Sequence, residues 1–226
     1  KNDKQVLQIT WDCMKFKKIL RDASYSGNLE DVIKQVTTLT STPALDDKPF
    51  FEVTLDSVVR LKNDILLNGP AVKNYLSQVA PLPYHPEFRF GKELEARLSE
   101  HGINSGYKIA LKEASLLNSE PETIYRPHRN QFVGAGNQVD EISGLQHFEL
   151  AGIDGDVAAI GWVADINYYG AIPLSALVKG IRFRVGNIQV GEPDIVAEEF
   201  PEARFNSWCI GDIHVLSNKV LPNGRR

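Results

Sequence analysis

Four arginines in the second half of the chain have a type and a spacing that suit chemistry with an anion. Arg182 and Arg184 alternate along the strand-like run GIRFRV, and Arg126 and Arg129 lie in the run YRPHR. A guanidinium can hold a phosphate through two parallel hydrogen bonds, so all four are candidates for phosphate or partner contacts. Alternating basic residues are also what the solvated face of a half-buried strand shows, and that is the simpler expectation here.

A second pair of arginines lies at the C-terminal end of the sequence. The turn tripeptide Pro222, Asn223 and Gly224 follows a strand-like run and precedes Arg225 and Arg226. An arginine at the tip of a loop after a rigid strand can reach a nucleotide phosphate that a neighbouring domain holds. A frayed basic tail is the alternative interpretation.

Other chemistry finds little support in the sequence. The five histidines are far apart and form no HxxxH or HxH pair, so the sequence predicts no metal site. The run VGAGNQ supplies only half of a GxGxxG phosphate loop. Neither a GxSxG motif nor a calcium-loop pattern is present. The sequence therefore predicts no self-sufficient active site.

Composition and charge narrow the class of protein. The chain has 226 residues, of which 42% are hydrophobic, so it can bury a sizeable core. Its formal net charge of -4 argues against a dedicated nucleic-acid binder, whose surface would be strongly basic. Cys13 and Cys209 share no CxxC spacing and are expected to be reduced thiols. With no apolar run near the roughly 18 residues that cross a bilayer, we expect a cytoplasmic protein without a membrane partner.

The elements that must position these residues alternate between helices and strands in the first half. The spacing of apolar residues predicts a helix from residue 29 to 36, with Asn28 and Asp31 as its N-terminal cap. It also predicts helices over 72–79 and 91–102, of which the first must end before Pro81. Alternation in FFEVTLDSVV predicts a half-buried strand at 51–55.

From about residue 107 the pattern changes to strand after strand. The runs YKIALKE and ETIYRPH could pair, and LQHFEL with VAAIGWVADINY predicts an antiparallel hairpin. The alternation in GIRFRVGNIQV changes phase at Gly186 and Asn187, which indicates a turn or bulge. A helix opening at Pro193 and a last strand in CIGDIHVL complete the order strand, strand, strand, helix, strand. This order predicts an α+β fold with a mixed sheet and helices on one face.

Two long runs of the second half resemble a known family. GIRFRVGNIQVGEPD and EEFPEARFNSWCIGDIHVLSNKVLPNGRR resemble the middle, or transducer, region of the GHKL ATPases, which include the HtpG-type heat-shock chaperones, the MORC proteins and MutL. Leu221, Pro222 and Asn223 followed by Arg226 reproduce the chaperones' Asn-x-x-Arg ending, with one residue fewer before the Asn. The resemblance covers 107–226, and VKNYLSQVAPLPYHPEF extends it to about residue 51.

The resemblance implies a role in ATP sensing. In these families a basic residue of the final loop reaches the γ-phosphate of ATP held in the preceding domain, so Arg226 or Arg225 is the expected sensor. The family's nucleotide motifs, Glu-x-x-x-Asn-x-x-Asp and Asp-x-Gly-x-Gly, are absent from this chain. We therefore expect the chain alone to be inactive and without a cofactor, and ATP and magnesium to bind in a parent ATPase. The expected partners are that N-terminal nucleotide domain and a protein client, and the parent is expected to form a homodimer.

The expected organisation is a mixed helix and strand segment at 1–103, which adjoins the nucleotide domain, and a transducer-like middle domain at 104–226. Two alternative functions stay open. A nucleic-acid-binding module would use the four internal arginines, as MORC or MutL relatives suggest. An interaction domain without an ATP link would use an exposed aromatic patch of Trp162, Tyr168 and Tyr169.

Overall fold

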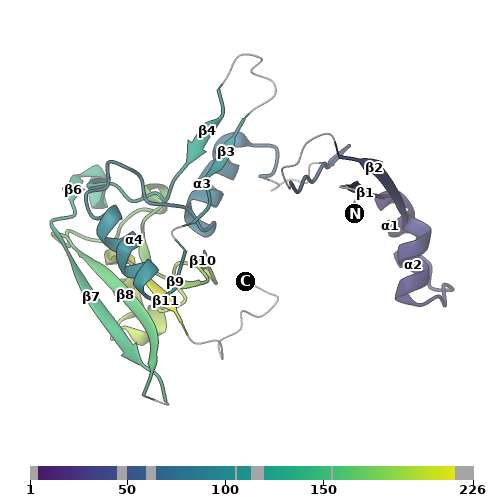
Figure 1. The fold of residues 1–226 in the computed structure, drawn as a ribbon. Helices are drawn as coiled ribbons and strands as arrows, with labels where there is room; N and C mark the ends of the chain where they lie inside the picture. The colour runs from purple at the N-terminus through teal and green to yellow at the C-terminus, as the bar shows by residue number, and fades with distance from the viewer. Residues whose placement is uncertain are drawn as a thin grey trace. The chain divides into compact units, whose positions relative to one another are not determined.

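A computed structural model describes residues 5–44, 50–59, 65–104, 106–112, 120–153 and 155–216. The chain forms two compact units, Lys1–Val59 and Arg60–Arg226, called unit 1 and unit 2 below (Figure 1). This division differs from the expected one at 103 and 104, because the helices before residue 103 pack against the C-terminal sheet. Within the described ranges, no helix is long and apolar enough to cross a membrane.

Unit 1 is a strand, two helices and a returning strand. These elements are β1 (Gln5–Trp11), α1 (Cys13–Arg21), α2 (Leu29–Val36) and β2 (Thr37–Pro43), and β1 pairs with β2 in antiparallel fashion. The predicted helix at 29–36 is confirmed. Its capping box is present, since the Asn28 side chain accepts from the Asp31 amide at 3.0 Å while the Asp31 carboxylate accepts from the Asn28 amide at 3.2 Å.

The predicted strand at 51–55 is wrong. Residues 50–56 carry no strand pairing, and Phe51, Val53 and Leu55 are all exposed. Alternation at period two shows only that one side of an extended segment is apolar and the other polar. A strand also needs the edge of a neighbouring strand, and none of the described strands pairs with this segment.

Two α-helices open unit 2, as predicted. α3 (Gly69–Val79) begins after Asn68, whose side chain accepts from the Ala71 amide at 3.1 Å, and it ends two residues before Pro81. α4 (Gly91–Glu100) ends before Gly102, whose positive φ of 73° stops the helix.

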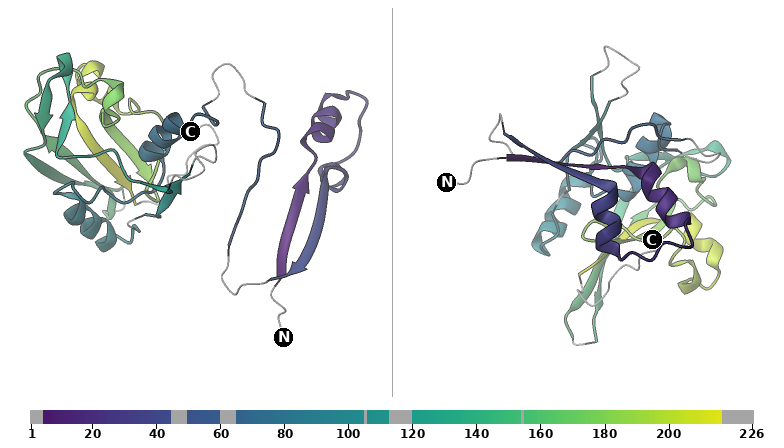
Figure 2. Two further views of the ribbon diagram at one scale, coloured as in Figure 1. Left: turned by 90° about the horizontal axis from the view of Figure 1, so that it is seen from above. Right: turned by 90° about the vertical axis from the view of Figure 1, so that its right-hand side faces the viewer.

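The centre of unit 2 is a five-stranded mixed sheet (Figure 2). Its strands are β7 (Gly144–Ala151), β8 (Val157–Asp165), β9 (Gly180–Val185), β10 (Ile188–Gln189) and β11 (Ile210–Val215), in the order β10-β9-β11-β8-β7. β9 and β11 are parallel, and the other neighbours are antiparallel. The hairpin β7–β8 and the turn between β9 and β10 confirm the predicted hairpin and phase change.

Two short strand pairs and four 3₁₀ segments complete the described part of the unit. β3 (Ile109–Leu111) pairs with β4 (Glu122–Ile124), as predicted, and β5 (Gln131–Val133) pairs with β6 (Val139–Glu141). The 3₁₀ segments are η1 (Ala135–Asn137), η2 (Leu174–Ala176), η3 (Ala197–Glu199) and η4 (Ala203–Trp208). The predicted α-helix from Pro193 is therefore wrong, because turns and the short segments η3 and η4 occupy this stretch. Pro201 lies between them, and its ring restricts the preceding residue to extended backbone.

The two faces of the sheet are covered differently. On one face Leu94 and Leu98 of α4 pack with Ile160 and Trp162 of β8 in the main apolar core. α3 approaches this same face through hydrogen bonds with Arg182 and Arg184 of β9. The opposite face is covered by residues from the η3 and η4 region in a second apolar cluster. Unit 2 thus confirms the expected α+β fold, with both α-helices of its described residues on one face of a mixed sheet.

Candidate functional site

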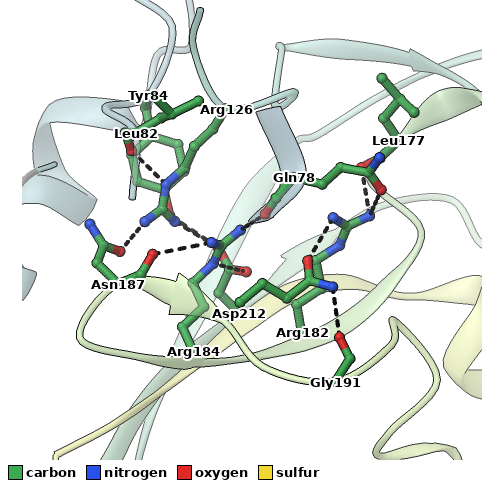
Figure 3. Close-up of polar contacts among 11 residues, drawn as sticks. Gln78, Leu82, Tyr84, Arg126, Leu177, Arg182, Arg184, Asn187, Gly191 and Asp212 are labelled. Carbon is green, nitrogen blue, oxygen red and sulfur yellow. Dashed lines mark hydrogen bonds and ion pairs between the residues drawn. The ribbon is translucent and has the colours of Figure 1, made fainter. Parts of the chain in front are cut away.

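Three of the four arginines from the sequence analysis meet in one buried cluster on the α3 face of the sheet (Figure 3). Arg182 and Arg184 come from β9, Arg126 lies two residues after β4, and Asp212 comes from the middle of β11. The arginines are 0 to 2% exposed. The expected solvated face is therefore wrong, because the end of α3 and the segment after it cover this half of the sheet.

Asp212 is the centre of the cluster. Its Oδ1 accepts a hydrogen bond from Arg184 Nε at 2.8 Å, and its Oδ2 accepts one from Arg126 Nη1 at 3.0 Å. Burial by itself would raise the pKa of Asp212, but the two guanidinium groups hold that pKa well below its usual range. The carboxylate is therefore ionised, and it joins β11 to β9 and to the segment after β4.

The same arginines hold the end of α3 and the chain that follows it. Arg184 Nη2 donates to the Gln78 carbonyl oxygen at 3.0 Å, and Arg126 Nε donates to the Leu82 carbonyl oxygen at 2.9 Å. The last carbonyls of a helix lack partners within the helix and carry partial negative charge, so cations are favoured there. The cluster thus fixes α3 against β9 and β11.

A buried tyrosine and an asparagine complete the contacts of Arg126. Its Nη1 also donates to the Tyr84 hydroxyl at 3.0 Å, and its Nη2 donates to Asn187 Oδ1. Burial raises the pKa of Tyr84 to about 12, so the phenol stays neutral. Asn187 in turn donates to the Asn104 carbonyl oxygen at 2.9 Å, which brings the loop after α4 into the network.

Arg182 differs from the other two because its partners are neutral. It donates to Gln189 Oε1 at 3.1 Å, to Gln78 Oε1 at 3.1 Å and to the Leu177 carbonyl oxygen at 2.6 Å. Its Nε has no hydrogen-bond partner within the part of the chain that the structure describes. Burial lowers the pKa of Arg182 to about 10, which still leaves it charged at neutral pH.

The cluster carries surplus positive charge. It contains three guanidinium groups and one carboxylate, which leaves a net charge of two positive units. Two buried histidines lie near it, His128 and His214, and burial lowers the pKa of each to about 3. Both rings are therefore neutral and do not change this balance.

The remaining predicted site residues are not part of the cluster. Arg129 is half-buried and donates to the carbonyl oxygens of Arg126 and His128. The tripeptide Pro222, Asn223 and Gly224 and both terminal arginines, Arg225 and Arg226, lie outside the described residues. With Arg126, Arg182 and Arg184 buried, the nucleic-acid alternative keeps only one of its four arginines near the surface.

The proposed aromatic patch is divided by burial. Trp162 is 3% exposed and belongs to the main core, whereas Tyr168 and Tyr169 are 44% and 65% exposed. Tyr168 lines a small pocket beside Asp140, and a second pocket lies between α4 and His214. Each has a volume of about 10 Å³, enough for roughly one water molecule.

In the described ranges, no three His, Cys, Asp or Glu side chains come together in a group that could hold a metal ion. Cys13 and Cys209 are free thiols in different units. The arginine cluster contains no nucleophile and no titratable base near neutral pH. It is suited to hold elements in a fixed arrangement.

Sequence reasoning missed the partners of these arginines. Asp212 lies in the apolar run CIGDIHVL, where a single carboxylate inside a strand pattern is unusual unless it is paired. The spacing Asp-x-His in this run and Arg-x-Arg in GIRFRV places polar side chains on one face of each strand. That shared period is the signal that could have indicated a buried polar layer between two neighbouring strands.

Comparison with known proteins adds no relative. No protein-family model matches the chain, and neither curated proteins nor solved structures give a significant match.

Proposed function

We propose that this chain is the coupling, or middle, domain of an ATP-dependent, chaperone-like GHKL ATPase. In this role it senses the γ-phosphate of ATP bound in a separate N-terminal domain and relays that state to a protein partner or client. The resemblance of the second half to the transducer region of these ATPases suggests the role. ATP and magnesium would bind in the separate domain, and this chain would supply an arginine.

One observation of the structure carries the proposal, namely the position of Asp212 on β11. Asp212 is fully buried and lies in ion pairs with Arg126 and Arg184. β11 continues only to Val215, so Asp212 lies about 10 Å along the strand from the start of the segment that carries the terminal arginines. A force on that segment acts on a strand that two buried ion pairs fix in place. The arginines of these ion pairs also contact α3 and the chain that follows it.

This anchoring supports a coupling role because a relay needs a rigid connection. A strand held only by backbone hydrogen bonds to its neighbouring strands could shift register without moving the helices that cover it. Here any shift of β11 must either break the contacts of Asp212 or move Arg126, Arg184 and the end of α3 together. ATP would shift the balance between two arrangements through contacts that ADP cannot make.

The test uses the protein in which this chain is joined to its nucleotide-binding domain. Arg226→Ala should reduce ATP turnover on the order of 10- to 1000-fold, the usual range for loss of one charge-stabilising donor. ADP affinity should stay unchanged, because ADP lacks the phosphate that Arg226 contacts. Arg225→Ala should have a smaller effect, and Arg204→Ala, an exposed arginine on η4, serves as the matched control.

Three outcomes would decide the proposal. If Arg225→Ala proves the more damaging variant, Arg225 is the sensor. If both variants turn over ATP like the wild type, the sensor role is refuted. Turnover of ATP by the isolated chain at a rate comparable with the joined protein would also contradict it.

A further inference from the structure

The five-stranded sheet of unit 2 ends in two unequal edges. β10 at one edge has two residues, whereas β7 at the other has eight. β7 pairs with β8 on its inner side, and no hydrogen bond of the described residues reaches its outer side. Figure 1 shows β7 at the border of the sheet. An edge strand of this length presents a row of free backbone N–H and C=O groups to another strand.

The features that usually protect an edge strand are missing from most of β7. It contains no lysine and no proline, and its irregularity is confined to Leu150 and Ala151 at the distal end. Its two ionisable side chains are tied to α4. His147 Nε2 lies 2.7 Å from Glu93 Oε1, and Arg97 Nη2 donates to Glu149 Oε1 at 2.9 Å. These contacts leave the backbone edge itself uncovered.

We propose that β7 pairs with β7 of a second copy of this chain, in antiparallel fashion about a two-fold axis at Phe148. Two identical edges related by a two-fold axis can form only an antiparallel pair, and the same residues then meet from both sides. In this register His147 lies opposite Glu149 of the second copy, twice. On the other face of the sheet, Gln146 lies opposite Leu150 of the second copy.

The alternative registers fit less well. Centring the pair on His147 places Glu149 opposite Leu145, which gives the carboxylate an apolar neighbour and sets the two His147 side chains against each other. If one β7 strand is shifted along the other by a single residue, side chains from one face of the first sheet lie opposite side chains from the other face of the second sheet. Only the register at Phe148 pairs a base with an acid on each side of the axis.

The same symmetry is the reason for choosing a second copy over an unrelated strand. One histidine and one glutamate lie at equal distances on either side of Phe148, so the edge is complementary to itself. A single pair of edges buries little surface, which makes the association weak and dependent on concentration. This inference does not depend on the proposed ATP-sensing function.

The first experiment measures two properties of the full chain over one range of concentration, namely its mass in solution and the hydrogen exchange of its backbone amides. Sedimentation between about 10 µM and about 1 mM should show the mass rise from monomer toward dimer, as expected for a small interface. Over the same range, alternate amides of β7 that point away from β8 should gain protection from hydrogen exchange. A monomer at every concentration overturns the proposal, as does a dimer whose β7 amides keep their exchange rates.

The second experiment uses a matched pair of variants at Leu150, which is 45% exposed. In the proposed pair, position 150 faces Gln146 of the second copy, whose amide donates to the Asp165 carboxylate at 2.6 Å. Leu150→Glu should weaken association by about tenfold, because the repulsion from that carboxylate occurs twice. Leu150→Lys should leave association unchanged or strengthen it. Equal effects of the two variants would overturn the proposed register.

Discussion

The three buried arginines of unit 2 are not equivalent, because only Arg126 and Arg184 face a carboxylate. Each of these two is paired with one oxygen of Asp212, while Arg182 relies on two glutamine side chains and a carbonyl oxygen. Burying a charge is costly unless it is paired and hydrogen-bonded. Arg182 therefore adds hydrogen bonds to the network but also one of its two surplus positive charges.

This difference predicts unequal effects of removing the guanidinium groups. Arg184→Met should lower the free energy of unfolding by about 3 kcal/mol, since it leaves one oxygen of a buried carboxylate without its partner. Arg182→Met should lower it by only about 1 kcal/mol, because relief of the surplus charge offsets part of the lost hydrogen bonding. Urea unfolding followed by tryptophan fluorescence, to which the buried Trp162 contributes, measures both, with the exposed Arg204→Met as control. Equal losses for Arg182 and Arg184 would refute the role of surplus charge.

The two buried histidines predict how stability depends on pH. Burial lowers the pKa of His128 and His214 from 6.5 to about 3 in the folded chain, so between these values only the unfolded chain binds the protons. The contribution of the two neutral rings to the free energy of unfolding is fully present above about pH 6.5. It falls as the pH is lowered, with a slope of up to about 3 kcal/mol per pH unit for two rings.

Denaturant unfolding between pH 6.5 and 5 tests this, above the range where most carboxylates titrate. His128→Phe removes one of the two proton sites. The new ring can keep the contacts with Phe88 and Trp162, whose centroids lie 5.9 and 5.2 Å from that of His128. The slope should be shallower in this variant, and an unchanged slope would show that His128 does not contribute.

At the scale of elements, the sequence predicts those parts whose signals are local. The helix at 29–36 carries its own capping box, and α3 ends where Pro81 excludes continuation. The β7–β8 hairpin likewise has alternation on both sides of a tight turn. Each of these signals lies within a few residues of the element it specifies, so no knowledge of the rest of the fold is needed.

The elements and the site that were misjudged depend on distant parts of the chain. The segment 51–55 has a strand pattern but no pairing partner among the described strands, and the run after Pro193 forms turns and 3₁₀ segments over a sheet face. Arg182 and Arg184 were expected to be solvated because alternation shows that one face of the strand is apolar and the other polar. It does not show whether another element covers the polar face. What covers them is the end of α3, about a hundred residues earlier in the sequence.

At the scale of the whole unit, the cluster joins segments that are far apart in the chain. Gln78, Arg126, Arg184 and Asp212 belong to α3, the segment after β4, β9 and β11. Their contacts lie on one face of the sheet, so the loss of the central carboxylate should be felt in all four segments. The opposite face has an apolar cluster of its own and should be less affected.

Asp212→Asn tests whether the cluster transmits a local change in this way. Asparagine keeps one acceptor but places an N–H donor against the second guanidinium, so Arg126 loses its charged partner and its hold on the Leu82 carbonyl weakens. The reporters are the Tyr107 amide, which donates to the Pro81 carbonyl oxygen at 2.7 Å, and the Arg126 amide, which donates to that of Pro83 at 3.1 Å.

Hydrogen exchange at these two amides should accelerate on the order of tenfold to a hundredfold, since the segment they hold opens locally without its anchor. The Glu199 amide, which donates to the Val196 carbonyl oxygen at 3.1 Å beside the apolar cluster of the opposite face, should change much less. An equal acceleration at all three amides would mean that the variant lowers global stability alone. In that case Asp212 would be a stabilising residue of the core and not a connection between β11 and the chain that follows α3.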